Sequence, residues 1–309
     1  MSDLLSFPVV DKNHYADLID RYQMYLYQSD YSKNTIKNYL ASIRKLIAFL
    51  EVDLFKVNES HIKLFKDDLY HRLKMRVTTI NRHLHVIRHF MGWLFDMGLI
   101  KNDLSRNIKL LKRQKPVTAP KGMVQREINL ILQLAADTKR TIKDRNTTIL
   151  YLMLNAGLRV GEVVDLNVGD VLVNARSGKL IIHGKGNKER EVILSGRLRK
   201  ILDDYMVYRE KYAPDCFNEA DPLFLSERKQ RLSVRSIQKM VNNLATRSKI
   251  DRLNISPHTL RHTFGKNYYS TSNHDIVSLQ GLMGHSSIDT TVIYSLPDEE
   301  QIEFNLNNL

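Results

Sequence analysis

The sequence is poor in cysteine, since its 309 residues include only Cys216. A single cysteine excludes a disulfide framework within the chain and a zinc site built on several thiolates. Long apolar runs are also missing. The most apolar segment, residues 148–158, is about half as long as the ~20 residues that a membrane span requires. The first ten residues lack the basic start and apolar run of a signal peptide. We therefore expect a cytoplasmic, soluble protein without membrane contact.

Acidic residues are scarce relative to basic ones. The chain has 47 Lys and Arg against 34 Asp and Glu, which gives a formal net charge of +13. This excess favours a polyanionic partner, with nucleic acid first and an anionic membrane second, although a basic protein can simply be soluble. Apolar residues make up 43% of the chain, which is enough for sizeable cores, and the length suits two domains better than one.

The first part of the chain has the pattern of helices throughout. Apolar residues recur at helical spacing in segments that begin near residues 15, 34, 58 and 78, and Gly98 ends the last of them. Four helices joined by short connections predict a compact helical domain over residues 1–111.

Basic residues accumulate in the second half of this domain and just beyond it. From Arg72 to Lys115 the chain carries eleven Lys or Arg but only two acidic residues, Asp96 and Asp103. A solvated helix face is the ordinary explanation, but the bias favours a surface that contacts phosphates. The candidate DNA-binding residues are Arg72, Lys74, Arg76, Arg82, Arg88, Lys112, Arg113 and Lys115.

Residues 112–122 (KRQKPVTAPKG) predict a basic linker, because they hold two prolines, a glycine and almost nothing apolar. Such a linker would let two domains close around a duplex as a clamp. Residues 123–297 predict a second, mixed domain, with two strands at 179–183 and 191–194 on either side of a turn. The expected helices span 125–136, 141–155, 160–166, 198–212, 233–249, 257–269, 275–283 and 287–294. The expected fold is thus mainly α with a small β-hairpin in the second, α+β domain.

Several polar residues of this second part suit phosphate chemistry, although each signal alone is weak. Arg159 precedes a helix start, where free N–H groups favour an anion, but an ordinary ion pair with Glu162 is the alternative. His258 and Arg261 share one face near a helix N-terminus, where an anion would relieve their repulsion by the helix dipole. Lys185 lies at the hairpin turn, where it can enter a DNA groove or remain solvated.

A zinc site must also be considered, because His258 and His262 have the spacing of a zinc-binding pair. The glutamate of an HExxH motif is absent, since Thr259 follows His258, and no third ligand is evident. We therefore expect no metal here.

In order along the chain, the polar segments read GLRVGE (157–162), GKGNKER (184–190), HTLRH (258–262), GHSS (284–287) and TVIY (291–294). This series resembles the active-site signature of tyrosine recombinases, the phage integrase family. The resemblance covers nearly the whole chain, and the layout is similar to that of the simple Xer-type, integron and transposon-resolving members. Gly161 stands where Ser is common and Met283 where Leu is common, but neither change removes a reacting group.

The resemblance implies a site-specific recombinase that cuts and rejoins DNA through a 3′-phosphotyrosine, without metal or other cofactor, for resolution or integration of DNA. The implied catalytic residues are Arg159, Lys185, His258, Arg261, His285 and Tyr294, with Glu162 and His262 in supporting roles. The implied partner is double-stranded DNA with paired inverted half-sites, on which the protein forms a tetramer that joins two DNA sites. A second recombinase or an accessory protein would fit this scheme. Residues 298–309 are then expected to be a tail exchanged between subunits.

Two other functions share parts of this pattern. A type IB topoisomerase-like enzyme has a similar site but relaxes one strand without exchange. The helical first domain, the basic linker and the small size favour the recombinase. A non-catalytic DNA-binding protein is the other alternative, but it would not need competent groups at all six active-site positions.

Overall fold

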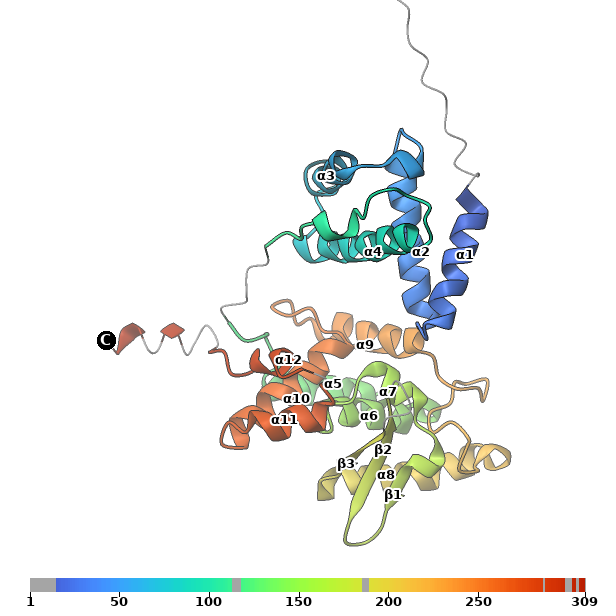
Figure 1. Ribbon diagram of the computed structural model, residues 1–309. Coiled ribbons are helices and arrows are strands. Elements are labelled where there is room, and N and C mark those ends of the chain that lie inside the picture. Colours follow the sequence, from blue (N-terminus) through green and yellow to red (C-terminus); the bar gives the residue numbers. More distant parts are fainter. Residues whose placement is uncertain are drawn as a thin grey trace, which may run out of the picture. The chain divides into compact units, whose positions relative to one another are not determined.

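The computed structural model describes residues 15–112, 118–184, 189–285 and 287–297, together with residues 302–303 and 306–308. The chain divides into two compact units, unit 1 at Met1–Lys115 and unit 2 at Pro116–Leu309 (Figure 1). Each unit has its own large cluster of buried apolar side chains, which is the mark of separate domains.

Unit 1 is helical. Its main elements are α1 (Ala16–Gln28), α2 (Lys33–Phe49), α3 (Glu59–Asp67) and α4 (Val77–Asp96), and a π-helical turn, Asp68–Arg72, continues α3. Ser32 and Asn58 cap α2 and α3, because their side chains accept hydrogen bonds from backbone N–H groups of the first turn. The apolar stripe of α4, which includes the fully buried Ile80, Leu84 and Phe90, faces the core of this unit. The predicted helical first domain is confirmed.

Unit 2 is built around one buried helix, α6 (Arg140–Asn155), whose residues Ile149, Leu150 and Met153 have no solvent exposure. Helices from earlier and later parts of the chain pack against it. The other helices of this unit are α5 (Gln125–Ala136), α7 (Val160–Asp165), α8 (Gly196–Tyr212), α9 (Val234–Ser248), α10 (Pro257–Thr271), α11 (Ile276–Met283) and α12 (Asp289–Val292).

The sheet of unit 2 has three antiparallel strands in the order β1 (Val171–Val173), β2 (Gly178–His183) and β3 (Glu189–Ile193). Leu180 pairs with Val192, and both are buried, so alternate residues of the strands face the core. The expectation of a two-stranded hairpin was incomplete, since β1 adds a third strand. Three residues are too few for period-2 alternation to be visible in a sequence. The mainly α class with a small sheet is confirmed.

The helix expected over residues 287–294 is shorter than predicted. The structure has α12 only over Asp289–Val292, and Tyr294 lies in the turn that follows. The backbone N–H groups of Tyr294 and Ser295 donate to carbonyls three residues back instead of four, which is the tighter pattern of a helix end. Tyr294 is therefore placed by a turn and not by a helix.

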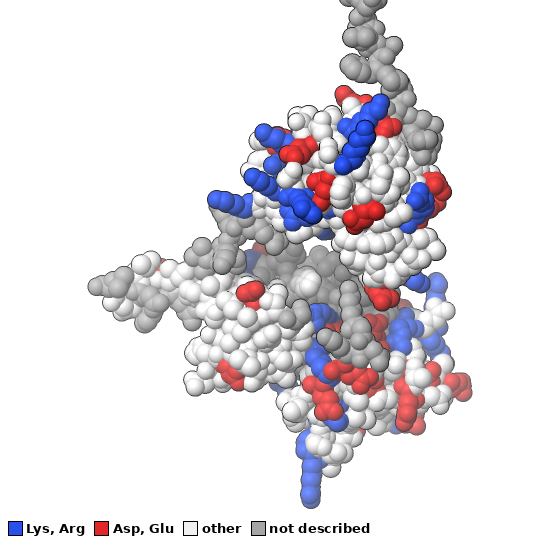
Figure 2. Space-filling view, in the orientation of Figure 1, with Lys and Arg blue, Asp and Glu red and all other residues white. Residues whose placement is uncertain are grey.

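Surface charge is mixed rather than uniformly basic. Figure 2 shows acidic side chains gathered over the strands and α8 of unit 2, with basic side chains among them. In the described ranges, no helix combines the length and apolarity that crossing a bilayer demands.

Candidate active site

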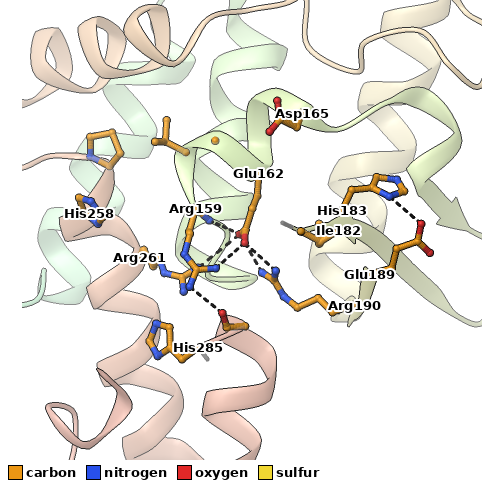
Figure 3. Close-up of a pocket in the computed structure, with 15 residues that line it drawn as sticks. Arg159, Glu162, Asp165, Ile182, His183, Glu189, Arg190, His258, Arg261 and His285 are labelled. Carbon is orange, nitrogen blue, oxygen red and sulfur yellow. Dashed lines mark hydrogen bonds and ion pairs between the residues drawn. The ribbon is translucent and has the colours of Figure 1, made fainter. Parts of the chain in front are cut away.

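A cavity of about 970 Å³ opens in unit 2 where the first turns of α7 and α10 meet the ends of β2 and β3 and the turn after α11 (Figure 3). Four of the residues expected to be catalytic line it, although they are up to 126 residues apart in the sequence, from position 159 to position 285. These four are Arg159, His258, Arg261 and His285, and the cavity is also lined by Glu162, His183, Glu189 and Arg190.

Glu162 is the hub of this cavity, because one carboxylate binds three cationic side chains. Its Oε1 accepts hydrogen bonds from Nη1 of Arg159 and Nη1 of Arg190, both at 2.8 Å. Its Oε2 accepts from Nη2 of Arg190 at 3.0 Å and from the backbone N–H of Arg159 at 2.7 Å. Arg261 lies 3.7 Å away as an ion pair. Burial alone would raise the pKa of Glu162, but the hydrogen bonds from Arg190 and Arg159 outweigh it and lower the pKa.

Arg159 caps α7, and its side chain makes both the ion pair and the cavity contact that the sequence left as alternatives. Besides Glu162, it binds the carbonyl oxygen of Gly284 through Nη2 at 2.9 Å. Its side chain remains 41% exposed to solvent. The ion pair therefore orients the guanidinium without removing it from solvent.

Arg261 is the most buried of the cavity cations, with 5% of its surface exposed. Its guanidinium donates to the carbonyl oxygens of Gly157 and Met283, the latter at 2.6 Å. Burial and the nearby charge of Arg159 lower its pKa to about 10, so it remains charged at neutral pH. Gly157 has a φ of +62°, and a Cβ there would strike the ring of Phe264, so this bend requires glycine.

His285 follows α11 and faces the same cavity (Figure 3). Its Nδ1 lies 2.8 Å from the hydroxyl of Thr291. Burial, followed by the positive charges of Arg261 and Arg159, lowers the pKa of His285 to about 4. The imidazole is thus neutral at pH 7 and carries one N–H for donation.

Tyr294 does not line the cavity. It is 4% exposed and belongs to a small apolar cluster with Phe264, Leu279 and Met283. Its phenol oxygen lies 2.7 Å from Nδ1 of His262. Burial raises the pKa of Tyr294 to about 12, against the opposing charge of Arg261. The phenol is therefore protonated, sheltered and paired with a histidine.

His262 and His258 differ although both are on α10. His258 is exposed at the cavity rim, whereas His262 is half-buried between His258 and Tyr294. Burial and then the charges of His258 and Arg261 lower the pKa of His262. Gly265, one turn further along α10, leaves room for the tyrosine ring, because a Cβ there would lie 2.5 Å from Cζ of Tyr294.

The other predicted site residues have varied positions. Lys185 lies outside the described residues, in the segment of the sequence between β2 and β3. In unit 1, Arg72 is ion-paired with Asp68, and the guanidinium of Arg88 donates to the carbonyl of Ile108. Lys74, Arg76, Arg82 and Lys112 are exposed, whereas Arg113 and Lys115 lie outside the described residues.

Arg190 was not among the expected site residues. It ends the GKGNKER segment, so its proximity to Lys185 in the sequence was the available signal. Its contacts with Glu162, 28 residues earlier, could be found only in the folded chain.

The arginine cluster of the cavity is suited to an anion. The guanidiniums of Arg159, Arg190 and Arg261 surround the single carboxylate of Glu162, while two further acidic residues, Asp165 and Glu189, also line the cavity. Fixed guanidinium groups bind phosphate oxygens through paired hydrogen bonds. Within the described part of the chain, no three His, Cys, Asp or Glu side chains come together in a way that could hold a metal ion.

Comparison with known proteins gives a consistent picture. A family model described as "Phage integrase family" matches residues 121–301, and one described as "Phage integrase, N-terminal SAM-like domain" matches residues 18–99. The chain is 30% identical to the tyrosine recombinase XerC of Neisseria meningitidis serogroup B over 93% of both chains. It is 34% identical to XerC of Caldanaerobacter subterraneus subsp. tengcongensis, over 67% of this chain and 58% of that one.

Solved structures show the same fold at lower identity. A complex of the site-specific recombinase XerH with palindromic difH DNA matches with a TM-score of 0.73 at 19% identity, over 88% of this chain and 79% of that chain. A lambda integrase tetramer on a Holliday junction matches with a TM-score of 0.67 at 16% identity, over 88% and 77% of the two chains.

Proposed function

The chain belongs to the phage integrase family and is a tyrosine recombinase that cleaves and rejoins DNA at specific sites, and we propose that it does so at the arginine-lined cavity of unit 2. The observation that carries this proposal is the group of three guanidiniums held by one carboxylate, beside a neutral histidine. In this group, Arg159 and Arg261 offer positive charge and hydrogen bonds to a phosphodiester, whose transition state carries about one negative charge more than its ground state.

In this proposal Tyr294 attacks the scissile phosphorus, the P–O bond to the 5′-oxygen breaks, and a 3′-phosphotyrosine forms. Arg159 and Arg261 bind the non-bridging oxygens. His285 donates one hydrogen bond to them. If the Thr291 hydroxyl donates to Nδ1 of His285, the ring proton lies on Nε2 and is free for this bond.

Two protons must move in the cleavage step. The phenol of Tyr294 has to lose a proton, and His258 or His262 accepts it, as His262 is already hydrogen bonded to the phenol oxygen. The leaving 5′-oxygen has to gain one, which we assign to Lys185. Rejoining reverses both transfers when a 5′-hydroxyl attacks the phosphotyrosine, so the bond energy is kept and no cofactor is consumed.

The tyrosine must leave its apolar cluster to reach the phosphate, because it does not line the cavity. We propose that DNA binding supplies this change, since the turn that carries Tyr294 is joined to the cavity through the bond between His285 and Thr291. The tail after Pro297 is the adjacent segment and is assigned to exchange between subunits.

The proposed partner is duplex DNA with paired inverted half-sites, bound in the cytoplasm through the basic residues of unit 1 and the linker as well as the cavity. We propose a tetramer on two sites as the recombining species. The similar XerH structure holds a palindromic DNA, and the similar lambda integrase structure is a tetramer on a Holliday junction.

Covalent trapping tests the proposal without knowledge of the target. Nicked duplexes with a randomised core are incubated with the protein, and complexes that survive denaturation are recovered and sequenced. We expect the wild-type chain to enrich one sequence family, and Tyr294→Phe to yield no covalent complex while retaining DNA binding. Tyr269→Phe, which removes a hydroxyl from α10 away from the cavity, is the control. Trapping by Tyr294→Phe would contradict the assignment of the nucleophile.

A further inference from the structure

Arg190 projects from β3 into the cavity and has contacts on both faces, although no step of the proposed mechanism uses it. Its side chain is 19% exposed. The two Nη atoms form a fork on the two oxygens of Glu162, at 2.8 and 3.0 Å. The third nitrogen of the guanidinium, Nε, is buried and has no hydrogen-bond partner among the described residues. Both terminal nitrogens of the Arg190 guanidinium therefore bind the same carboxylate, that of Glu162.

The other face of Arg190 contacts the turn that carries His285. A Cβ built on Gly284 would lie 2.8 Å from Nη1, 2.9 Å from Cζ and 3.0 Å from Nε of Arg190. The guanidinium therefore lies against the bare backbone of Gly284, whose φ is +59°. The carbonyl oxygen of Gly284 accepts from Arg159, and that of Met283 accepts from Arg261. All three cavity arginines thus contact the same short turn, Arg159 and Arg261 through hydrogen bonds and Arg190 through packing.

We propose that Arg190 is a positioning residue for the cleavage reaction. It joins β3 to Glu162 and to the turn before His285, so that the phosphate-binding groups keep one geometry. This inference rests on the proposed function of the cavity. Its action is assigned through Glu162 and Gly284, because its two Nη atoms pair with both oxygens of Glu162 and its guanidinium packs against Gly284.

Removal of the guanidinium should have a defined effect. Glu162 would keep only Arg159 as a close partner and would lose two of its hydrogen bonds, so the orientation of Arg159 would relax. A displacement of about 1 Å in a catalytic group can reduce a rate by about 10²-fold. Lysine would not replace Arg190, because a single ammonium cannot span both carboxylate oxygens in a fixed plane.

The test uses the full chain and the nicked duplex selected by trapping. Single-turnover cleavage and DNA binding are measured for Arg190→Met and Arg190→Lys. We expect both variants to cleave about 10²-fold more slowly and to bind the duplex nearly as well as wild type. The matched control is Lys179→Met, which breaks the exposed Lys179–Glu191 pair between the same two strands and should cleave normally.

A double variant separates positioning from a general structural role. If Arg190 acts through Glu162, then Arg190→Met should add little to the loss already caused by Glu162→Gln, whereas independent effects would multiply. Thermal melts identify any variant that unfolds. Gly284→Asn then probes the same contact from the other side, since Asn tolerates a positive φ but places a Cβ against Arg190. This variant should also cleave slowly.

The results that would overturn the inference are distinct from those that would overturn the function. Wild-type cleavage by Arg190→Met or by Gly284→Asn, full rescue by Arg190→Lys, or multiplicative losses in the double variant would each reject a positioning role. The recombinase assignment would stand in all of these cases, because the wild-type chain would still trap DNA. A wild-type chain that traps no duplex would instead reject the proposed function of the cavity.

Discussion

Arg261 and Tyr294 are nearly equally inaccessible to solvent, at 5% and 4% exposure, yet their surroundings are opposite. The arginine side of the site, which consists of Arg159, Glu162, Arg190 and Arg261, is held by ion pairs and by hydrogen bonds to backbone carbonyls. The tyrosine side consists of Tyr294, His262 and their apolar neighbours, and its side chains have one polar contact with one another among the described residues.

In the proposed mechanism, this difference separates the groups that bind the phosphate from the group that attacks it. The arginine side has its geometry before any phosphate arrives, which reduces the reorganisation needed in the transition state. The tyrosine side keeps Tyr294, the proposed nucleophile, protonated, with a pKa of about 12, and away from solvent. In the proposed mechanism, the phosphate site is therefore formed in advance, and the nucleophile acts only after a local rearrangement.

The largest effect that would test the comparison comes from the buried arginine. Arg261→Met should reduce single-turnover cleavage by at least about 10²–10³-fold, because a preorganised donor to the transition state is lost. It should also lower stability, since the carbonyls of Gly157 and Met283 lose their donor. Arg209→Met is the matched control, because this arginine is also buried and donates to backbone carbonyls away from the cavity. It should destabilise the protein but leave cleavage of the folded fraction normal. Equal losses of cleavage in both variants would make Arg261 merely structural.

A second test asks whether the arginine side can support DNA cleavage without the side chain of Lys185. Lys185→Ala should slow cleavage by about 10²-fold or more if the lysine protonates the leaving oxygen. A duplex with sulfur at the 5′-bridging position needs no proton to leave, so it should restore much of the rate. The measurement is single-turnover cleavage of both duplexes. Equal slowing on both would make Lys185 a binding residue.

A third test addresses the tyrosine side. His262→Phe removes the polar partner of the phenol, and an unpaired buried hydroxyl costs about 1–3 kcal/mol. We expect a lower melting temperature and faster nitration of Tyr294 by tetranitromethane, followed by peptide mass spectrometry, with duplex binding nearly unchanged. His258→Phe is the control, because His258 lies at the cavity rim. Unchanged nitration in His262→Phe would mean that apolar packing alone holds the tyrosine.

The smallest effect concerns the strands that support the cavity. His183 of β2 lies 2.8 Å from Asp170 and 3.0 Å from Glu189, and the hydrogen bond with Asp170 raises its pKa. Its stabilising contribution should therefore be fully present below the unfolded pKa of about 6.5 and be lost as pH rises through the folded value. The melting temperature of wild type relative to His183→Gln should show a small advantage at pH 6 that disappears at pH 9. A constant difference would exclude this linkage.

Much of the fold followed from local patterns. The helices of unit 1 and most of those of unit 2 have apolar residues at helical spacing and recognisable caps, such as Ser32 and Ser256, so their positions could be predicted. The pattern did not show β1, because three residues are too few, and it overextended the last helix to Tyr294. Such short elements depend on the partners against which they pack.

The sequence by itself determined which groups are available for the chemistry. The motifs around Arg159, Arg261 and His285 name residue types and local spacing, and local spacing is enough to place His258 and Arg261 in the first turns of one helix. Only the tertiary structure decided which groups meet. Three contacts show this. The contact between Arg190 and Glu162 spans 28 residues of the sequence, that between Arg159 and Gly284 spans 125, and that between Tyr294 and His262 spans 32. The packing of strands and helices around α6 creates these contacts, and packing at that range leaves no periodic trace in a sequence.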